Sequence, residues 1–371
     1  MIKRILADYA FELSKKYPVV TITGPRQSGK TTLARQTFRN KAYANLEHPV
    51  TRSFALEDPE GFLAQFPDGA IIDEVQRAPE LLSFIQVRVD AEKRNDFFIL
   101  TGSQQFEMSE KISQSLAGRT AILRLLPFSL KELSGYGEFS TDELIVKGGY
   151  PRLYEQGIEP AQFFGDYFET YIQRDVRQLA ELRNLSSLSN DVGVSQTTAR
   201  EWLSILQASY IVFLLTPFHA NLGKRLVKTP KLYFYDSGLA AWLCGVEDEK
   251  HIAFHPLRGQ FLENLVISKL IKYRLNQGRR MNLTFYRDNI GNEVDLFYHI
   301  ADTVIPIEIK SVQTFSSSFF EQFVKLCSLA VSLAHKGIVG YNNDEEQDRK
   351  DGRVVNFRKL NDLINRIDAG E

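Results

Sequence analysis

The chain is poor in the residues that mark secreted and zinc-binding proteins. Its 371 residues include two cysteines, Cys244 and Cys327, and six histidines. Two cysteines exclude a disulfide framework, and the scattered histidines leave no zinc-ligand spacing. Neither sign of charge dominates, because 45 basic and 46 acidic residues give a net charge of −1. Any binding of nucleic acid must therefore use local patches, and we expect a reduced, cytoplasmic protein.

Long hydrophobic runs are also missing. The longest apolar run near the middle of the chain, 210–215, is far too short to span a bilayer. The first segment, 1–13, has the apolar spacing of an amphipathic helix, but the charged residues within it are unlike a signal peptide. We therefore expect no association with membranes. A content of 43% hydrophobic and 25% charged residues predicts a globular protein of two or three domains.

A phosphate-binding loop (P-loop) lies between a predicted strand, 18–23, and a predicted helix, 33–38. Its glycines let successive backbone N–H groups wrap around a phosphate. Lys30 is expected to reach the β- and γ-phosphates, and the Thr31 hydroxyl to ligate Mg²⁺. Arg26 is either a phosphate contact or a structural one. The loop residues that we expect to bind ATP are Gly24, Pro25, Arg26, Gln27, Ser28, Gly29, Lys30, Thr31 and Thr32.

An acidic motif follows the second predicted strand, 70–72. Asp73 is expected to hold Mg²⁺ through water or through Thr31. Glu74 directly after it suits a general base that polarises the attacking water. The alternative for Glu74 is a solvated carboxylate at a strand end. The two motifs predict a P-loop ATPase with ATP and Mg²⁺ as cofactors.

Two further apolar runs extend the predicted sheet. The run 97–100 is the candidate for a strand inserted between the two phosphate-binding strands, and its tip carries Thr101 and Ser103. Either side chain senses the γ-phosphate, or both belong to a turn. The run 121–126 completes the sheet. Alternating strand and helix patterns of this kind are typical of a parallel α/β fold.

The motifs together resemble a known group of proteins, the AAA-superfamily ATPases that carry a C-terminal domain of unknown function. The resemblance covers nearly the whole chain. It implies a C-terminal α/β domain of the restriction-endonuclease-like, PD-(D/E)XK type. The segments that carry it are 24–32, 73–79, 100–103, 116–119 and 148–151, which reads GGYP.

Arg119 is the candidate arginine finger of the ATPase. It follows a predicted helix end and precedes a predicted strand. Supplied by a neighbouring subunit, its guanidinium would neutralise charge in the transition state, which makes a homo-oligomer the expected assembly. The alternative is an arginine that interacts with the dipole at a helix C-terminus.

The middle of the chain carries a helix-turn-helix pattern over 185–206, in which Ser195 caps the second helix. Predicted strands 210–215 and 231–235, with basic residues between them, complete a winged helix. Its second helix would enter a DNA major groove while wing lysines touch phosphates. The alternative is a winged helix that only packs between domains.

A predicted helix with an aromatic stripe, 164–179, precedes this pattern, and we expect it to pack against the ATPase. In the resembled group more helical sequence separates the Arg174-Asp175 helix from the winged helix. Here only 176–183 intervene. This shortening puts the mutual placement of the two parts in doubt.

The last third contains two predicted paired strands, 293–298 and 304–310. Alternation sends one set of side chains inward and the other to the opposite face. The inward set is Val294, Leu296, Tyr298, Ile305, Ile307 and Ile309, and the other is Glu293, Asp295, Glu308 and Lys310. A hairpin loop of even length near Ala301 would place Asp295 across from Glu308. Two carboxylates that close need a cation between them.

This is the D…E-x-K pattern of restriction-endonuclease-like nucleases, as the resemblance also implies. Asp295 and Glu308 are expected to bind Mg²⁺ or Mn²⁺, and Lys310 to orient or deprotonate the attacking water. Glu263, on a predicted helix, matches a supporting acid. The alternative is a carboxylate–lysine ladder on a sheet face. Six basic residues between 269 and 288 would neutralise DNA phosphates or form a solvated helix face.

These patterns predict an α/β protein of three domains. We expect an AAA-type P-loop ATPase domain with a parallel sheet over 1–135, a helical linker and winged-helix region over 136–250, and a restriction-endonuclease-like domain over 251–371. The expected function is ATP hydrolysis coupled to DNA binding and metal-dependent DNA cleavage. One alternative is a regulatory or signalling ATPase whose nuclease-like domain is inactive and binds a partner or DNA. Another is a nucleotide-dependent transcriptional regulator.

Overall fold

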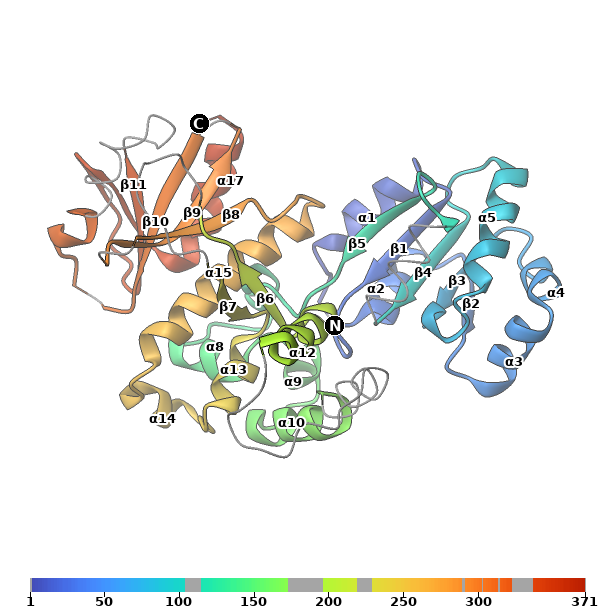
Figure 1. The fold of residues 1–371 in the computed structure, drawn as a ribbon, viewed down its shortest axis with the longest axis horizontal. Coiled ribbons are helices and arrows are strands. Elements are labelled where there is room, and N and C mark those ends of the chain that lie inside the picture. The colour runs from blue at the N-terminus through green and yellow to red at the C-terminus, as the bar shows by residue number, and fades with distance from the viewer. Residues whose placement is uncertain are drawn as a thin grey trace.

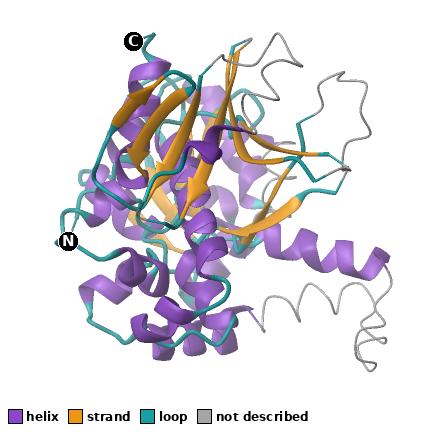
Figure 2. Ribbon diagram, turned by 90° about the vertical axis from the view of Figure 1, so that its left-hand side faces the viewer, coloured by secondary structure: helices purple, strands orange, loops and turns teal. Residues whose placement is uncertain are grey.

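A computed structural model describes residues 2–103, 115–172, 196–218, 229–288, 291–301, 303–312, 314–321 and 336–370. Two β-sheets form separate α/β units at opposite ends of the molecule, and a mainly helical region lies between them (Figure 1). Seen from the side of the C-terminal unit, helices pack on the sheets and the described loops lie at the periphery (Figure 2). The mixed α/β class predicted from the sequence is confirmed.

The first unit is built around five parallel strands. The strands are β1 (Val19–Thr23), β2 (Ala42–Asn45), β3 (Ala70–Asp73), β4 (Phe98–Gly102) and β5 (Thr120–Arg124). Their order is β2-β3-β4-β1-β5, so β4 lies between β3 and β1, as the sequence predicts for the inserted strand. The edge strand β2 was not predicted, because its sequence, AYAN, is short and lacks an apolar run.

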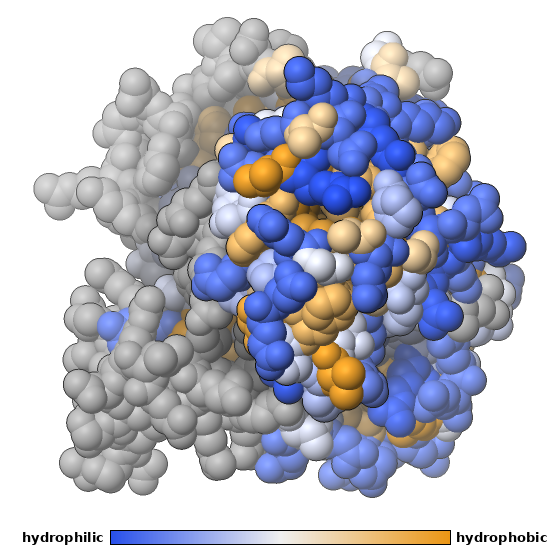
Figure 3. All heavy atoms as spheres, turned by 90° about the vertical axis from the view of Figure 1, so that its right-hand side faces the viewer, coloured by the Kyte–Doolittle hydropathy of each residue, from blue (hydrophilic) through white to orange (hydrophobic). Residues whose placement is uncertain are grey.

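Helices cover both faces of this sheet. They are α1 (Leu6–Ser14), α2 (Lys30–Thr37), α3 (Pro49–Glu57), α4 (Pro59–Ala64) and α5 (Leu81–Glu92), with a 3-10 turn, η1 (Val75–Arg77). Alternate strand residues face opposite ways, so Ile22 packs with α1 and α2, whereas Val19 packs with α4 and α5. The outward surface at this end is largely hydrophilic, with hydrophobic side chains singly or in small groups (Figure 3).

The middle region consists of short helices and one β-hairpin. Its elements are α7 (Leu130–Leu133), α8 (Thr141–Lys147), α9 (Pro151–Glu155), α10 (Pro160–Tyr167), the π-helical turn η2 (Phe168–Ile172), α12 (Gln196–Ala208), β6 (Val212–Leu215), β7 (Lys231–Phe234), α13 (Ser237–Leu243) and α14 (Glu249–Phe254). The second helix of the predicted helix-turn-helix corresponds to α12, and β6 pairs with β7 as expected for a wing. Arg174, Asp175, the shortened segment 176–183, the first helix of the pattern and the basic segment 219–228 lie outside the described residues.

The C-terminal unit has a six-stranded mixed sheet. Its elements are α15 (Arg258–Asn276), β8 (Leu283–Arg287), β9 (Glu293–Ile300), β10 (Thr303–Lys310), η3 (Ser317–Phe320), β11 (Gly337–Tyr341), β12 (Gln347–Arg349), β13 (Gly352–Asn356), η4 (Phe357–Lys359) and α17 (Leu360–Asp368). The strand order is β12-β13-β11-β10-β9-β8. The predicted β9–β10 hairpin is confirmed: Ile300 pairs with Thr303, so the loop has two residues.

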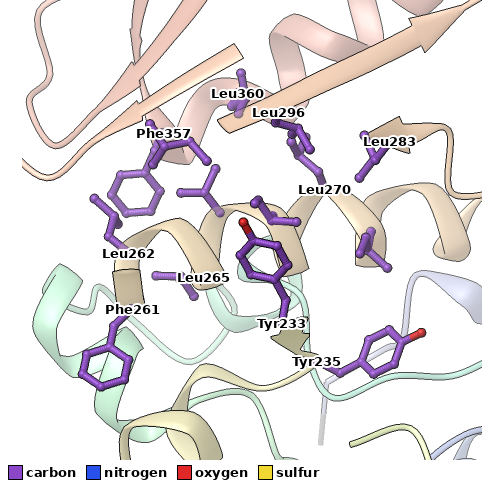
Figure 4. Close-up of a cluster of buried hydrophobic side chains, with 14 of the residues drawn as sticks. Tyr233, Tyr235, Phe261, Leu262, Leu265, Leu270, Leu283, Leu296, Phe357 and Leu360 are labelled. Atoms are coloured by element: carbon purple, nitrogen blue, oxygen red, sulfur yellow. The ribbon is translucent and has the colours of Figure 1, made fainter. Parts of the chain in front are cut away.

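One hydrophobic cluster joins the middle region to the C-terminal unit. Tyr233 of β7 and Tyr235, just after β7, belong to the same cluster as Leu262 of α15, Leu296 of β9 and Phe357 (Figure 4). The same cluster includes residues on both sides of the predicted boundary at 250–251. The predicted wing therefore packs into the interior, and the three-domain division stays a prediction.

The expectation that Val294 shares a face with Leu296 and Tyr298 is wrong. Val294 packs with Phe297 in a second cluster on the other side of the sheet, whereas Leu296 and Tyr298 face α15. The cause is an irregularity in the β8–β9 ladder next to Phe285, which breaks the two-residue alternation. Both faces of this sheet are buried, so the acidic residues do not lie on an open, solvated face.

Candidate functional site

The P-loop joins the carboxyl end of β1 to the start of α2, in the strand–loop–helix order that the sequence predicts. Gly24 has φ 151°, and a Cβ there would lie 2.1 Å from the carbonyl oxygen of Leu125. Gly29 is left-handed, with φ 90°. Both glycines are therefore required by the backbone, because L side chains rarely adopt such φ values.

Lys30 is buried and points back into the loop. Its Nζ donates hydrogen bonds to the carbonyl oxygens of Gly24 (3.0 Å) and Pro25 (2.8 Å). Burial lowers the pKa of Lys30 to about 8, although the carboxylates of Glu74 and Asp73 act in the opposite direction. The Lys30 ammonium is thus held inside the P-loop, close to the carboxylates of Asp73 and Glu74.

Two further polar groups of the loop support an anion there. Ser28 Oγ and Arg26 Nε are buried and have no hydrogen-bond partner among the described residues. Buried polar groups are nearly always paired, so such unpaired donors are expected where a ligand binds. The Arg26 guanidinium also lies 5.3 Å from the ring of Tyr171. Thr32 and Gln27 are exposed at the loop surface. The loop therefore fits the phosphates of a nucleotide.

Asp73 lies at the end of β3 and accepts hydrogen bonds from three hydroxyl groups. Thr31 Oγ1 is 2.9 Å and 3.0 Å from its two carboxylate oxygens, and the Tyr43 hydroxyl is 2.7 Å away. Thr101 Oγ1 donates the third hydrogen bond. The structure thus brings Thr31 and Asp73 together, as predicted, and their oxygens are the ligand type that Mg²⁺ prefers. Tyr43 was missed because nothing in the weak β2 pattern marks it.

Glu74 sits just beyond Asp73 in a left-handed conformation, with φ 56°. Its carboxylate accepts hydrogen bonds from Gln76 and, at 3.4 Å, from Ser103. Thr101 therefore donates to the Asp73 carboxylate and Ser103 to that of Glu74. A γ-phosphate-sensing role for either side chain stays a prediction. Gln76 was not predicted. Positive φ in a residue with a side chain is strained and is frequent at functional sites.

Arg119 lies away from these residues. It immediately precedes β5, and Val19, at the start of β1, donates a backbone hydrogen bond to its carbonyl oxygen. Because the strands are parallel, Arg119 lies at their amino-terminal ends, whereas the P-loop lies at their carboxyl-terminal ends. Its guanidinium forms a two-point ion pair with Asp90 (2.6 Å and 2.8 Å). Arg119 cannot reach a nucleotide in its own chain, and its action on a neighbour stays a prediction.

Residues from outside the sheet form hydrogen bonds to the P-loop and to the end of β1. Arg4 donates a hydrogen bond of 2.7 Å to the carbonyl oxygen of Ser28. The hydroxyls of Thr23, the last residue of β1, and Tyr210, just before β6, are hydrogen-bonded at 2.8 Å. A rearrangement of the P-loop would therefore displace residues of the middle region through these hydrogen bonds.

The acidic cluster of the C-terminal unit lies where β9 begins and β10 ends. The β9–β10 ladder ends at the pair of Leu296 with Ile307, and Asp295 and Glu308 are the next residues of the two strands. Their direct pairing stays a prediction. Asp295 Oδ2 accepts a hydrogen bond of 2.8 Å from the backbone N–H of Ile309, and Lys310 Nζ donates to Glu308 Oε1 at 2.6 Å. Against the effect of burial, the Glu308 carboxylate raises the pKa of Lys310.

Glu263 of α15 is bound by the middle region. Its carboxylate accepts a hydrogen bond from Lys231 Nζ at 3.2 Å and another from the Tyr233 hydroxyl, both from β7. Lys231 also forms an ion pair of 2.5 Å with Glu293. Against the effect of burial, these acids and Asp295 raise the pKa of Lys231. Sequence reasoning did not connect Lys231 and Tyr233 with these acids, because both lie in the strand predicted to form a wing whose lysines touch DNA phosphates.

Three acids were expected to bind Mg²⁺ or Mn²⁺ here. Among the described residues, no group of three His, Cys, Asp or Glu side chains gathers closely enough to hold a metal. Burial, with Glu308 and Glu263 nearby, raises the pKa of Asp295. Glu308 Oε2 is buried and has no hydrogen-bond partner among the described residues. The donor set fits a cation chemically, but Lys231 and Lys310 hold two of the acids.

Three of the six basic residues in the predicted phosphate-neutralising stretch are interior, so that expectation is wrong for them, whereas Arg279, Arg280 and Arg287 are exposed. Lys269, Lys272 and Arg274 are buried. Lys272 Nζ donates to the carbonyl oxygen of Phe128 at 3.2 Å, and Arg274 bonds the Tyr298 hydroxyl at 2.6 Å. Their charges serve contacts between segments, which hydropathy alone does not reveal.

Of the described helices, none is long and apolar enough to cross a membrane.

Comparisons with known proteins agree with the assignment of the first unit as an ATPase domain. Residues 16–134 match the model of an AAA domain. Two domains of unknown function follow, DUF8612 over 138–190 and 177–250, and DUF4143 over 258–360. An uncharacterized protein of Mycobacterium tuberculosis, Rv2008c, is 30% identical over 325 residues, which are 81% of this chain and 72% of that protein. The uncharacterized protein Mb2031c of Mycobacterium bovis matches equally.

The chain belongs to the family of these mycobacterial proteins. It is an ATPase of the AAA, P-loop type. Among solved structures, the Walker-type ATPase PABY2304 of Pyrococcus abyssi is similar over 64% of this chain and 94% of that one, with 16% identity and a TM-score of 0.40. AMPPCP-bound DnaA from Aquifex aeolicus is similar over 54% and 76%, with 14% identity and a TM-score of 0.32.

Proposed function

We propose that this AAA ATPase is a switch in which ATP at the P-loop controls the acidic cluster of the C-terminal unit, with DNA as the substrate. One observation carries the proposal. The β6–β7 segment touches both sites, because Tyr210 at one end bonds Thr23 beside the P-loop, and Lys231 at the other bonds Glu263 and Glu293. The paired strands β6 and β7 thus connect the nucleotide site to the acids.

The hairpin is suited to transmit a displacement. Its ladder pairs Val212 with Phe234 and Leu215 with Lys231, so the two strands move together. Beyond β6, Phe218 donates a backbone hydrogen bond of 2.7 Å to Phe285 of β8. A shift of Thr23 when nucleotide binds would therefore move Lys231 relative to α15.

The ATPase step is assigned to residues around Asp73. Lys30 would bind the β- and γ-phosphates, and Thr31 and Asp73 would hold Mg²⁺, which neutralises phosphate charge. Glu74 would accept the proton of the attacking water, oriented by its contacts with Gln76 and Ser103. Arg119 would complete the site from a neighbouring subunit, and a homo-oligomer is part of the proposal.

At the other end, withdrawal of Lys231 would release Glu263 to join Asp295 and Glu308. These acids would then hold Mg²⁺ or Mn²⁺, which supplies charge neutralisation for phosphodiester hydrolysis. Lys310 would orient the water. We assign DNA contact to α12 and to the basic segment 219–228. The restriction-endonuclease-like assignment of this unit rests on the D…E-x-K pattern and on the β9–β10 register.

A second candidate is a regulatory ATPase whose nuclease-like unit is inactive. The ion pairs of Lys231 favour it, because an ammonium group already supplies positive charge to Glu263 and Glu293. In this protein the C-terminal unit would bind DNA or a protein partner without cleaving it.

The deciding experiment is a cleavage assay on linear, supercoiled and branched DNA with Mg²⁺ or Mn²⁺, with and without ATP. We expect the wild type to cut only with ATP, Lys231→Met to cut without it, and Asp295→Ala to be inactive while its ATPase is intact. If neither the wild type nor Lys231→Met cuts DNA while ATP hydrolysis proceeds, the nuclease assignment is wrong and the regulatory ATPase is correct.

A further inference from the structure

A cavity of about 530 Å³ lies between the first helices of the middle region and the C-terminal unit, away from the P-loop and the acidic cluster. Leu133, Phe139 and Leu144 line one side of it. Lys269, Arg358 and Asn361 line the other. Its volume falls in the range of small-molecule sites, and both the middle region and the C-terminal unit contribute to its walls.

Lys269 of α15 is a buried ammonium group on the wall of this cavity, 2% exposed. Its Nζ donates to the carbonyl oxygens of Phe357 (2.5 Å) and Arg358 (2.6 Å). An ammonium has three N–H groups, so within the described part of the chain one donor is left over. Burial lowers the pKa of Lys269 to about 7, which an incoming anion would reverse.

Asn361 of α17 provides an independent observation. Its side chain is 9% exposed, and its Oδ1 has no hydrogen-bond partner among the described residues. A buried acceptor without a partner costs stability. Asn361 lines the same cavity, while its Oδ1 is covered by neighbouring atoms. A rotation of the side chain that uncovers Oδ1 would let a ligand hydroxyl group satisfy it.

Arg358 adds a second cation at the wall. It donates to the Phe139 carbonyl oxygen at 2.7 Å, which leaves other N–H groups of its guanidinium for a ligand. Lys131 is the third basic residue of the lining. The acids Glu138, Asp344 and Asp362 also line the cavity and balance these charges. A ligand with one anionic group and several hydroxyl donors matches this mixture better than a bare anion does.

We propose that the cavity binds a small sugar phosphate, with the phosphate on Lys269 and Arg358 and a hydroxyl on Asn361. The acids Asp344 and Asp362 accept further hydroxyl donors. Because the walls come from two units, occupancy adds a contact between them and so stabilises their association.

The test uses the full chain with Lys30→Ala, which weakens phosphate binding at the P-loop, and ribose 5-phosphate as the probe in isothermal titration calorimetry. We expect saturable binding at one site, weakened at least tenfold by Lys269→Met and by Asn361→Leu. Asn361→Leu removes an unpaired polar atom, so its Tm should equal or exceed that of the parent. This separates loss of binding from loss of folding. The matched control is Lys359→Met, an exposed lysine that binds Glu346 and should leave binding unchanged.

Three results would overturn the proposal. The first is the absence of saturable binding in the parent protein. The second is binding that Lys269→Met and Asn361→Leu leave intact. The third is inorganic phosphate binding as tightly as ribose 5-phosphate, because the hydroxyl contacts would then contribute nothing.

Discussion

The Arg4 guanidinium donates a hydrogen bond to the backbone carbonyl of Ser28 within the P-loop, at 2.7 Å. The same guanidinium forms an ion pair of 2.9 Å with Glu132, and both side chains are almost fully buried. Against the effect of burial, Arg4 lowers the pKa of Glu132. Arg4 therefore ties the nucleotide-binding loop to α7, where the middle region begins.

Arg4→Met should destabilise the protein strongly. It leaves the Glu132 carboxylate buried without its cation, which typically costs about 3–5 kcal/mol. The free energy of unfolding in urea measures the loss. Arg4→Met with Glu132→Leu should recover much of it, because neither charge of this buried pair is then left without its partner. Lys3→Met, which removes an exposed ion pair with Asp8, is the control and should change little. A small loss in Arg4→Met would mean that water reaches Glu132.

Replacing Lys30 and replacing Glu74 should impair ATP hydrolysis in different ways. Lys30→Ala removes a phosphate contact and should weaken nucleotide binding as well as turnover. Glu74→Gln keeps the shape of the site but loses the base, so kcat should fall by roughly 10²–10⁴ while ATP still binds. Steady-state hydrolysis and nucleotide binding by fluorescence distinguish the two. Full turnover by either variant would contradict the assigned roles.

Tyr210→Phe should uncouple the two sites. The substitution removes the hydroxyl that bonds Thr23 and keeps the ring in its core cluster. ATP hydrolysis should stay within about threefold of the wild type, since Tyr210 does not touch Lys30 or Asp73. Hydrogen exchange of β7 should respond to ATP in the wild type and not in this variant. An unchanged response in Tyr210→Phe would show that the signal takes another path.

Lys269 should give stability a distinctive pH dependence. Burial lowers its pKa to about 7, whereas an unfolded lysine titrates near 10.4. Between about pH 7 and pH 10 the unfolded chain binds more protons than the folded chain. The free energy of unfolding due to this group therefore rises with pH there, by at most about 1.4 kcal/mol per pH unit, and is flat below.

The measurement is urea unfolding of the wild type and of Lys269→Met from about pH 6 to about pH 9. The difference in unfolding free energy, wild type minus variant, should grow as the pH rises. Lys359→Met is the control, because that lysine is exposed. A constant difference for Lys269→Met would show that this ammonium keeps its ordinary pKa in the folded protein.

Local patterns predicted much of the fold. The P-loop, the inserted strand β4 and the β9–β10 register follow from glycine positions and two-residue alternation, which act within a few residues. The edge strand β2 and its Tyr43 have no such pattern, because an edge strand needs little apolar sequence. Val294 faces the unexpected side because its own strand, β9, has an extra residue opposite Phe285 of β8. Only the pairing between the two strands reveals this irregularity.

Burial of charge was the harder part to predict. Lys231, Lys269 and Lys272 look like surface residues in the sequence, since lysine is rarely buried. Their partners are far along the chain: Glu263 for Lys231, and the carbonyl oxygen of Phe128 for Lys272. Only the tertiary fold brings such partners together, so neither composition nor periodicity indicates them.

The position of Arg119 constrains the symmetry of any active assembly. Arg119 lies at the amino-terminal ends of the parallel strands and Lys30 at their carboxyl-terminal ends. A contact in which Arg119 of one copy serves the nucleotide of the next therefore brings opposite ends of two sheets together. A two-fold dimer does this only when the copies lie side by side and antiparallel, so that two such contacts form at once, and every other arrangement is head to tail. Repeated, a head-to-tail contact closes into a ring when the rotation between copies divides a full turn, and otherwise builds a helical filament.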